Sequence, residues 1–227
     1  MRLDVIPTCT STNAAIAPDA PHGYALMARE QTAGRGQRGN SWEAAPGENV
    51  TLSLMLRPEE VPAGRQFEVS EAVALGVVDL LDSLGIDNVA VKWPNDIYVG
   101  DRKICGILIE NSLTGTMIAR SIAGIGLNVN QTEWLSDAPN PVSIAQITGR
   151  KHSVDQLAKT MCERILARMD RGNNHTEYRQ RLWRGSGSWL WRTAQGEMLH
   201  APVSDVLPDG RIIIADRPFA FKEIFPA

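Results

Sequence analysis

The sequence has little cysteine and no long hydrophobic run. Cys9, Cys105 and Cys162 are odd in number and form no Cys-x-x-Cys pair, so neither a disulfide framework nor a zinc site is expected and all three thiols are predicted to be reduced packing residues. No apolar stretch approaches the roughly 20 residues needed to cross a bilayer. Asp4 and Pro7 interrupt the N-terminus where a signal peptide needs an apolar core. These absences predict a cytoplasmic protein without membrane contact.

An excess of positive charge is also missing, because 23 Lys and Arg face 26 Asp and Glu, a formal net charge of −3. This balance argues against a dedicated nucleic-acid-binding protein. No G-x-x-x-x-G-K-[ST] motif occurs, so a P-loop does not hold any bound ATP. Residues Gly34–Gly39 match G-x-G-x-x-G, but they lead toward Pro46-Gly47 and not into a helix. The dinucleotide-binding interpretation therefore fails on context.

Polar residues interrupt apolar strands between positions 90 and 110. Pro94 and Gly100-Asp101 mark the turns of a β-meander whose three expected strands are Val89–Trp93, Ile97–Val99 and Arg102–Glu110. Because a buried charge without a partner is costly, the interrupting side chains must face water or line a site. They are Lys92, Asn95, Asp96 and Lys103. Considered alone, this stretch fits a solvated hairpin equally well.

A glycine-rich loop at Gly34–Gly39 carries Arg35 and Arg38. Glycine allows close approach of the backbone to a ligand, and arginine forms charge-assisted hydrogen bonds with phosphate or carboxylate. We expect this loop to become ordered over a ligand. An ordinary surface loop is the alternative.

Hydrophobic periodicity predicts the remaining elements. Further strands are expected at Leu3–Ile6, Tyr24–Ala28, Val50–Leu56 and Met117–Val129, and helices at Gly64–Leu84, Ser143–Thr148 and Ser153–Met169. The arginines of the last helix, Arg164, Arg168 and Arg171, are predicted to form a solvated face. Beyond residue 185, short runs separated by glycine and proline predict a small β-barrel of about five strands with Trp189 and Trp191 in its core. The predicted domains are therefore residues 1–184 and 185–227.

Four motifs together resemble the biotin protein ligase family, which attaches biotin to carrier proteins. They are Gly34-Arg35-Gly36 closing on Trp42, Lys92–Asp96, Arg102–Glu110 and Gly124–Asn128. The resemblance implies an α+β fold, a mixed β-sheet covered by helices, with a small C-terminal β-barrel. It also implies an ATP-dependent reaction in which biotin becomes biotinyl-5′-AMP and is then transferred to a lysine of a biotin carboxyl carrier protein. Mg²⁺ would accompany the nucleotide, with ligands that the motifs do not identify.

The resemblance also assigns residues to roles. The catalytic residues would be Lys103, Arg35 and Asp96. Biotin would be bound by Ser11, Thr12, Asn13, Gln31, Gly34, Arg35, Lys103 and Gly106, where short hydroxyls can serve the ureido ring as donor and acceptor. The nucleotide would be bound by Arg35, Arg38, Trp42, Lys92, Asn95, Lys103 and Asn128. Gln37 stands where the family often has a second arginine, so Arg35 is the expected phosphate or carboxylate contact.

Three alternatives accompany this interpretation. Ser11–Asn13 has an equally good explanation as a helix cap. The enzyme could be a lipoate ligase of related fold, or the protein could be a catalytically silent biotin sensor or scaffold. Because the first ligase motif arrives by Ser11, we expect a stand-alone ligase without a DNA-binding winged helix and without DNA as a partner. Homodimer formation is left open.

Overall fold

The structure is a computed structural model that describes residues 1–135 and 140–227, apart from the side chain of Arg38. Its centre is a seven-stranded mixed sheet in the order β1-β2-β3-β7-β6-β5-β4. Strand β1 runs parallel to β2, and the other neighbouring strands are antiparallel. The strands are β1 (Arg2–Cys9), β2 (Tyr24–Gln31), β3 (Val50–Leu56), β4 (Val89–Lys92), β5 (Asp96–Val99), β6 (Arg102–Thr114) and β7 (Met117–Leu127). Every strand predicted for this region is confirmed.

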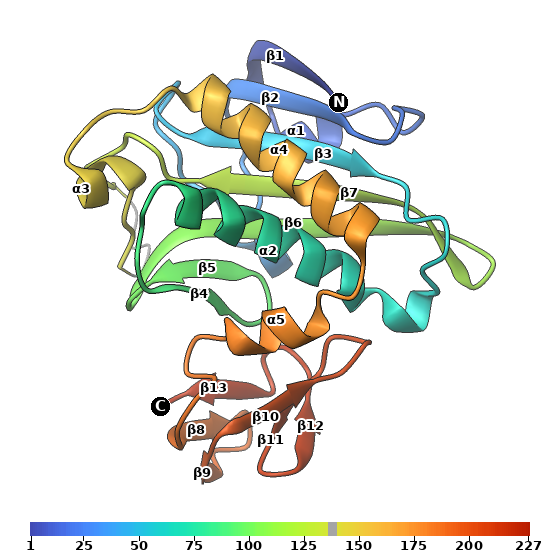
Figure 1. Cartoon of the computed structure of the whole chain (residues 1–227), viewed down its shortest axis with the longest axis vertical. Helices are drawn as coiled ribbons and strands as arrows, with labels where there is room; N and C mark the ends of the chain where they lie inside the picture. The colour runs from blue at the N-terminus through green and yellow to red at the C-terminus, as the bar shows by residue number, and fades with distance from the viewer. Residues whose placement is uncertain (136–139) are drawn as a thin grey trace.

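Helices cover the sheet unequally. They are α1 (Thr12–Ala15), α2 (Phe67–Ser83), α3 (Ile144–Thr148), α4 (Val154–Arg171) and α5 (His175–Gln180). Helices α2 and α4 lie across one face, while α1 lies on the opposite face (Figure 1). The two long helices pack closely because Gly76 has no side chain, and a Cβ there would lie 2.7 Å from the Ile165 Cα. Within the described part of the chain, no helix is long and apolar enough to cross a membrane.

The alternation of side chains along the central strands separates a core face from a ligand-accessible face. Leu52 and Leu54 point toward α2 and α4 and belong to the main hydrophobic core, as does Ile125 of β7. Between them, Ser53 is in register with Gly124. The same alternation places Gly106 opposite Gly126 on β6 and β7. Because these residues are small, the strands themselves project no large side chains from the centre of the second face of the sheet.

The C-terminal strands form two three-stranded antiparallel sheets, β13-β8-β9 and β10-β11-β12. The strands are β8 (Trp189–Thr193), β9 (Met198–Ala201), β10 (Val203–Val206), β11 (Ile212–Ile214), β12 (Arg217–Phe219) and β13 (Ile224–Pro226). They lie below α5 in Figure 1. The loop between β10 and β11 contacts the turn between β4 and β5, where Trp93 Nε1 donates to the Gly210 carbonyl at 2.9 Å. These strands correspond to the expected C-terminal module, while the boundary at residue 185 stays a prediction.

The prediction that both tryptophans of β8 lie in a core is wrong for Trp189. Trp191 is buried and donates from Nε1 to the Ala201 carbonyl. Trp189 is 39% exposed; its Nε1 bonds the Ser186 carbonyl, and the Arg184 guanidinium lies 4.8 Å from its ring centroid. A sheet of three short strands is too small to cover both rings.

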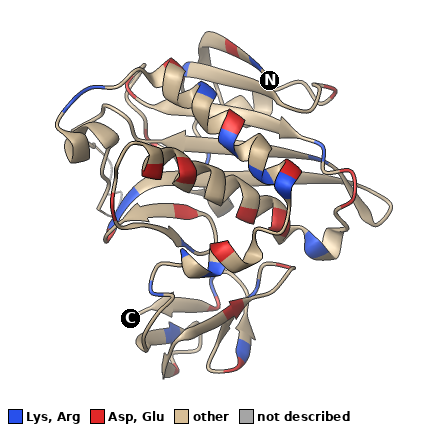
Figure 2. Ribbon diagram, viewed as in Figure 1, with Lys and Arg blue, Asp and Glu red and all other residues tan. Residues whose placement is uncertain are grey.

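The predicted solvated arginine face on α4 is wrong for Arg168. Its side chain is only 7% exposed and forms ion pairs with Asp79 of α2 and Glu177 of α5. Every charged residue of α2 is acidic, and Figure 2 shows these acids beside the mixed charges of α4. The hydrogen bonds from Arg168 lower the pKa of Glu177 to about 2. Arg171, at 58% exposed, keeps the solvated position expected of it.

A second charged cluster joins α2, α5 and the C-terminal strands. His175 contacts Glu71 through Nδ1 at 2.7 Å and Asp205 through Nε2 at 3.0 Å, and Arg179 also pairs with Asp205. Burial raises the pKa of Glu71. Burial acts to lower the pKa of His175, but the two carboxylates outweigh it and the pKa is raised. The cluster therefore favours the protonated forms of Glu71 and His175, where α2, α5 and the C-terminal strands meet.

Candidate active site

A cavity of about 360 Å³ lies on the bare face of the sheet. Its floor includes Gly106, Gly124 and Gly126, and the ring of Trp42 lies against the first and last of these. A Cβ at position 106 would lie 2.8 Å from the ring of Trp42, and one at position 126 would collide with it. The absence of side chains on the floor is therefore what admits the indole.

Uncharged polar groups gather at one end of the cavity. Ser11, Thr12 and Asn13 begin α1, but Ser11 makes no capping hydrogen bond through its side chain. Thr12 donates its backbone N–H to Gln31 Oε1 at 2.8 Å, and the Thr12 hydroxyl lies 3.1 Å from the same oxygen. Ser53, fully buried, contacts both Thr12 and Asn13. This end can exchange hydrogen bonds with a neutral polar ring.

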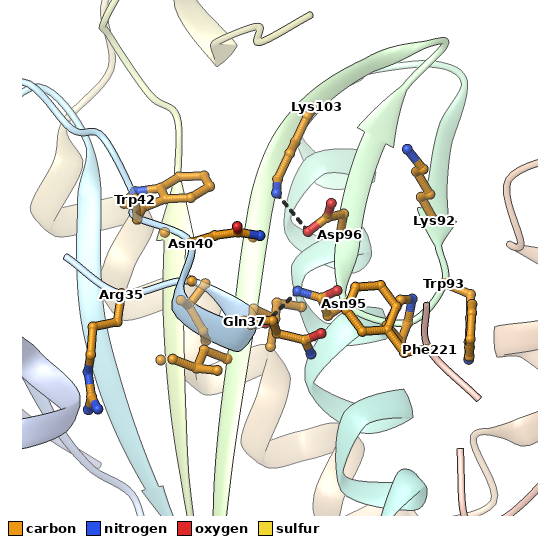
Figure 3. Close-up of a pocket in the computed structure, with 18 of the residues that line it drawn as sticks. Arg35, Gln37, Asn40, Trp42, Lys92, Trp93, Asn95, Asp96, Lys103 and Phe221 are labelled. Carbon is orange, nitrogen blue, oxygen red and sulfur yellow. Dashed lines mark hydrogen bonds and ion pairs between the residues drawn. The ribbon is translucent and has the colours of Figure 1, made fainter. Parts of the chain in front are cut away.

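Positive charge gathers at the other end. Lys103 Nζ lies 2.8 Å from Asp96 Oδ1, with the two side chains only 25% and 20% exposed, and 5.4 Å from the centroid of Trp42 (Figure 3). Lys92 donates to the Tyr98 hydroxyl at 2.8 Å, and burial lowers the pKa of Lys92. Partly desolvated cations interact strongly with an anion because water screens them little.

The glycine-rich loop is folded onto the sheet. Trp42 donates its backbone N–H to the Gly34 carbonyl, and η1 (Gln37–Gly39) forms a single turn. A Cβ at Gly34 would lie 2.7 Å from the Trp42 carbonyl oxygen. The two ends of the loop can therefore approach each other this closely only with glycine at position 34. Arg35 points away from Lys103 and pairs with Glu110 at 3.2 Å (Figure 3).

Most residues assigned by resemblance meet in this cavity. Its lining includes Ser11, Thr12, Asn13, Gln31, Arg35, Trp42, Lys92, Asn95, Asp96, Lys103 and Gly106. Gly34 is buried and does not line the cavity. Asn128 is buried and donates to the Val142 carbonyl at 3.0 Å and more weakly to the Lys103 carbonyl, so it supports the strand that carries Lys103. The predicted nucleotide contact of Arg38 lies outside the described side chains.

Sequence reasoning missed the contribution of the C-terminal strands. Phe221 and Lys222 line the cavity together with Ile224 and Phe225, and the Phe221 ring packs edge-on against Trp93 at 6.2 Å between centroids. No local pattern marks these residues, because their position depends on how the C-terminal sheets dock. The pair formed by Arg35 and Glu110 was missed as well, although both residues belong to quoted motifs.

The fold and cavity define a ligand-binding α+β domain that can hold an elongated molecule with a neutral polar ring at one end and an anionic group at the other. Among the residues of 1–135 and 140–227, no group of three or more His, Cys, Asp or Glu is placed to hold a metal ion. Among the described residues that line the cavity, Asp96 supplies the one carboxylate.

Comparison with known proteins agrees with this class. Residues 7–130 match the model of the biotin/lipoate A/B protein ligase family, and the chain belongs to that family. It is 39% identical over 130 residues to the bifunctional ligase/repressor BirA of Escherichia coli, covering 55% of this chain and 40% of that protein. It is 30% identical over 181 residues to a biotin--[acetyl-CoA-carboxylase] ligase of Mycobacterium tuberculosis, covering 76% and 66%. The chain thus spans about two fifths of the length of BirA.

Solved structures share the fold along the whole chain. A biotin protein ligase from Aquifex aeolicus in complex with biotin and ATP superposes with a TM-score of 0.81 at 20% identity, covering 100% of this chain and 99% of that one. A biotin protein ligase from Leishmania major in complex with biotinyl-5-AMP gives a TM-score of 0.65 at 19% identity, covering 96% and 98%. At these identities the likeness shows the fold, including the small C-terminal sheets.

Proposed function

We propose that the chain is an ATP-dependent biotin protein ligase, which converts biotin to biotinyl-5′-AMP and transfers it to a lysine of a biotin carboxyl carrier protein. The observation that carries the proposal is a cavity that has an uncharged hydrogen-bonding end at Thr12 and Gln31 and a cationic end at Lys103. Biotin has a polar ureido ring and a carboxylate at opposite ends. The names of the relatives and the structural neighbours support the same ligand.

In the first step, the carboxylate of biotin attacks the α-phosphate of ATP and pyrophosphate leaves. Two anions must approach each other, so cations fixed in place stabilise the charge that accumulates in the transition state. Lys103 is the group positioned for this role, because Asp96 holds its ammonium at 2.8 Å within the cavity. Lys92 supplies a second positive charge at the same end. Trp93 and Phe221 pack edge-on and form an aromatic wall on one side of the cavity.

In the second step, a lysine amine of the carrier attacks the mixed anhydride and AMP leaves. A lysine is protonated at neutral pH, so the amine must lose a proton before it attacks. Among the described lining residues Asp96 is the carboxylate, and we assign it the role of orienting this amine and accepting its proton. Once phosphate has drawn Lys103 away, the Asp96 oxygen that now faces Lys103 becomes available.

Mg²⁺ fits this cavity as a companion of the nucleotide. The one carboxylate among the described lining residues is too little for an all-protein site, but Mg²⁺ commonly binds through substrate phosphates, waters and one or two carboxylates. Asp96 is the residue that would reach it. The ion would neutralise triphosphate charge, and the mechanism above depends only on the residues of the chain.

The test is intact-mass analysis of an apo carrier domain incubated with the protein, ATP, Mg²⁺ and either biotin or lipoate. We expect the mass of one biotinyl group to be added, and pyrophosphate to appear even without the carrier. Addition of lipoyl instead would reassign the substrate to the lipoate branch of the family. Binding of biotin without pyrophosphate release would favour a silent sensor and contradict the enzyme.

A further inference from the structure

Glu110 of β6 has no part in the mechanism above, yet it contacts both the polar end and the loop. Its Oε2 accepts a hydrogen bond from Asn13 Nδ2 at 2.7 Å and lies 3.2 Å from the Arg35 guanidinium. Asn13 Nδ2 also faces the Leu108 carbonyl at 3.4 Å. A carboxylate and a carbonyl only accept hydrogen bonds. The side-chain nitrogen of Asn13 must therefore point at Glu110, and its oxygen must point the other way.

This orientation fixes the direction of the next hydrogen bonds. Asn13 Oδ1 is in close contact with Ser53 Oγ, and an amide oxygen only accepts, so Ser53 must donate its one hydroxyl hydrogen to Asn13. Ser53 Oγ also lies 2.8 Å from Thr12 Oγ1. Since Ser53 has no second hydrogen, a hydrogen in this contact can come only from Thr12, and the distance of 2.8 Å, shorter than the 3.1 Å to Gln31 Oε1, assigns the Thr12 hydrogen to Ser53.

One contact between two oxygens is then left with no hydrogen between them. Thr12 Oγ1 lies 3.1 Å from Gln31 Oε1, and Gln31 Oε1 already accepts from the Thr12 backbone. With the Thr12 hydrogen committed to Ser53, both oxygens are acceptors, and both side chains line the cavity. An N–H group from a ligand would satisfy the two oxygens together.

Packing prevents the chain of hydrogen bonds from reversing easily. Asn13 is 7% exposed and Ser53 is fully buried. Asn13 Oδ1 lies directly over Gly124, where a Cβ would collide with it. The exposed pair between Arg35 and Glu110 is worth little stability by itself, but it holds the carboxylate in place at the end of the network.

We propose that Glu110 is a specificity-determining positioning residue: its carboxylate orients Asn13, Ser53 and Thr12 so that Thr12 and Gln31 present two acceptors to a ring N–H of the ligand. The ligand class is a cyclic urea or a similar ring with N–H donors. The inference rests on the proposed function for the identity of that ring as the ureido ring of biotin.

Calorimetric titration with biotin tests this with three variants. Glu110→Gln should bind within about threefold of the wild type, because an amide oxygen can still accept from Asn13. Asn13→Asp places two carboxylates in contact and should weaken binding by about tenfold or more, the effect of one charged hydrogen bond. The double variant should recover to within about threefold, because the new amide nitrogen donates to the new carboxylate, whose other oxygen still accepts from Ser53.

Two further readouts separate this role from a merely structural one. Binding by Asn13→Asp should improve as the pH is lowered to about 5, since adjacent carboxylates then share a proton. The wild type and the double variant should prefer biotin to an analogue with one ring N–H replaced by oxygen. Glu197→Gln, which breaks the exposed pair with Arg217 away from the cavity, should change nothing.

The inference is overturned if Asn13→Asp binds as tightly as the wild type, or if the double variant binds as weakly as Asn13→Asp while its thermal unfolding matches the wild type. A wild-type protein that binds no biotin would instead overturn the proposed function. The two failures are therefore distinguishable.

Discussion

Replacing Lys103 by methionine should abolish most adenylate formation while leaving the fold intact. Methionine keeps the aliphatic stem that lies near Gly106 and Trp42 and removes only the charge. At an effective dielectric constant of about 20, two unit charges 4 Å apart interact by about 4 kcal/mol. Loss of one fixed group that stabilises a developing anion typically costs ~3–4 kcal/mol of barrier, or roughly 10²–10³-fold in rate. Pyrophosphate release from biotin and ATP, without a carrier, measures this step directly.

The neighbouring carboxylate makes the prediction sharper. Without Lys103, Asp96 remains as a partly buried negative charge facing the phosphates, so Lys103→Met should be slower than the double variant Lys103→Met with Asp96→Asn. Such non-additivity is expected of two groups in direct contact. Asp96→Asn alone should chiefly slow transfer to the carrier. Pyrophosphate release by Lys103→Met within tenfold of the wild type, or additive effects of the two changes, would refute the assignment of Lys103.

Three more predictions concern stability and the loop. Arg168→Met should lower the free energy of unfolding in urea by about 3 kcal/mol because it removes the ion-pair partner of Asp79 and leaves Glu177 with Arg171 alone, whereas the exposed Arg171→Met should cost at most about 0.5 kcal/mol; equal effects would contradict the buried position of Arg168. The raised pKa of His175 stabilises the folded state below the ordinary value of 6.5, and this contribution is lost as the pH rises through the folded-state value. The free energy of unfolding should therefore fall as the pH rises above 6.5, and His175→Asn should flatten that slope; an unchanged slope would assign it to other groups. Trypsin cleavage after Arg35 should be slowed by biotin with ATP and Mg²⁺ but little by ATP alone, and equal rates would show that the loop is no lid.

The sequence was sufficient for the elements of the larger sheet because each has a clear period. Strand β3 agrees with its prediction at both ends, and the helix expected at Ser143–Thr148 is α3, with Ser143 as its N-cap. Helix α5 was not predicted, since six residues carry too little periodicity to stand out. The C-terminal strands were recognised from their turns, but a pattern of turns does not say how two small sheets pair or which rings they can cover.

Arg168 shows a signal that was present and misread. It follows Met161 and Ile165 of the buried stripe of α4 by seven and three residues, so it lies on the buried face. The charge suggested solvent, while the spacing indicated burial beside the acidic helix α2. A charged residue at a core position of an amphipathic helix is better interpreted as one half of a buried pair, whose partner must be sought on the facing helix.

The cavity residues were found through resemblance, and the structure supplies the physical reason for three glycines in particular. The Asn13 side chain occupies the space that a side chain at Gly124 would take, and the Trp42 ring occupies the corresponding space at Gly106 and Gly126. The indole thus occupies the floor of the cavity between its polar and cationic ends. A ligand that spans both ends must either lie on that ring or displace it, and Trp42 is tied to the glycine-rich loop through its backbone bond to Gly34. Occupancy of the cavity and the conformation of the loop are therefore coupled through one aromatic side chain.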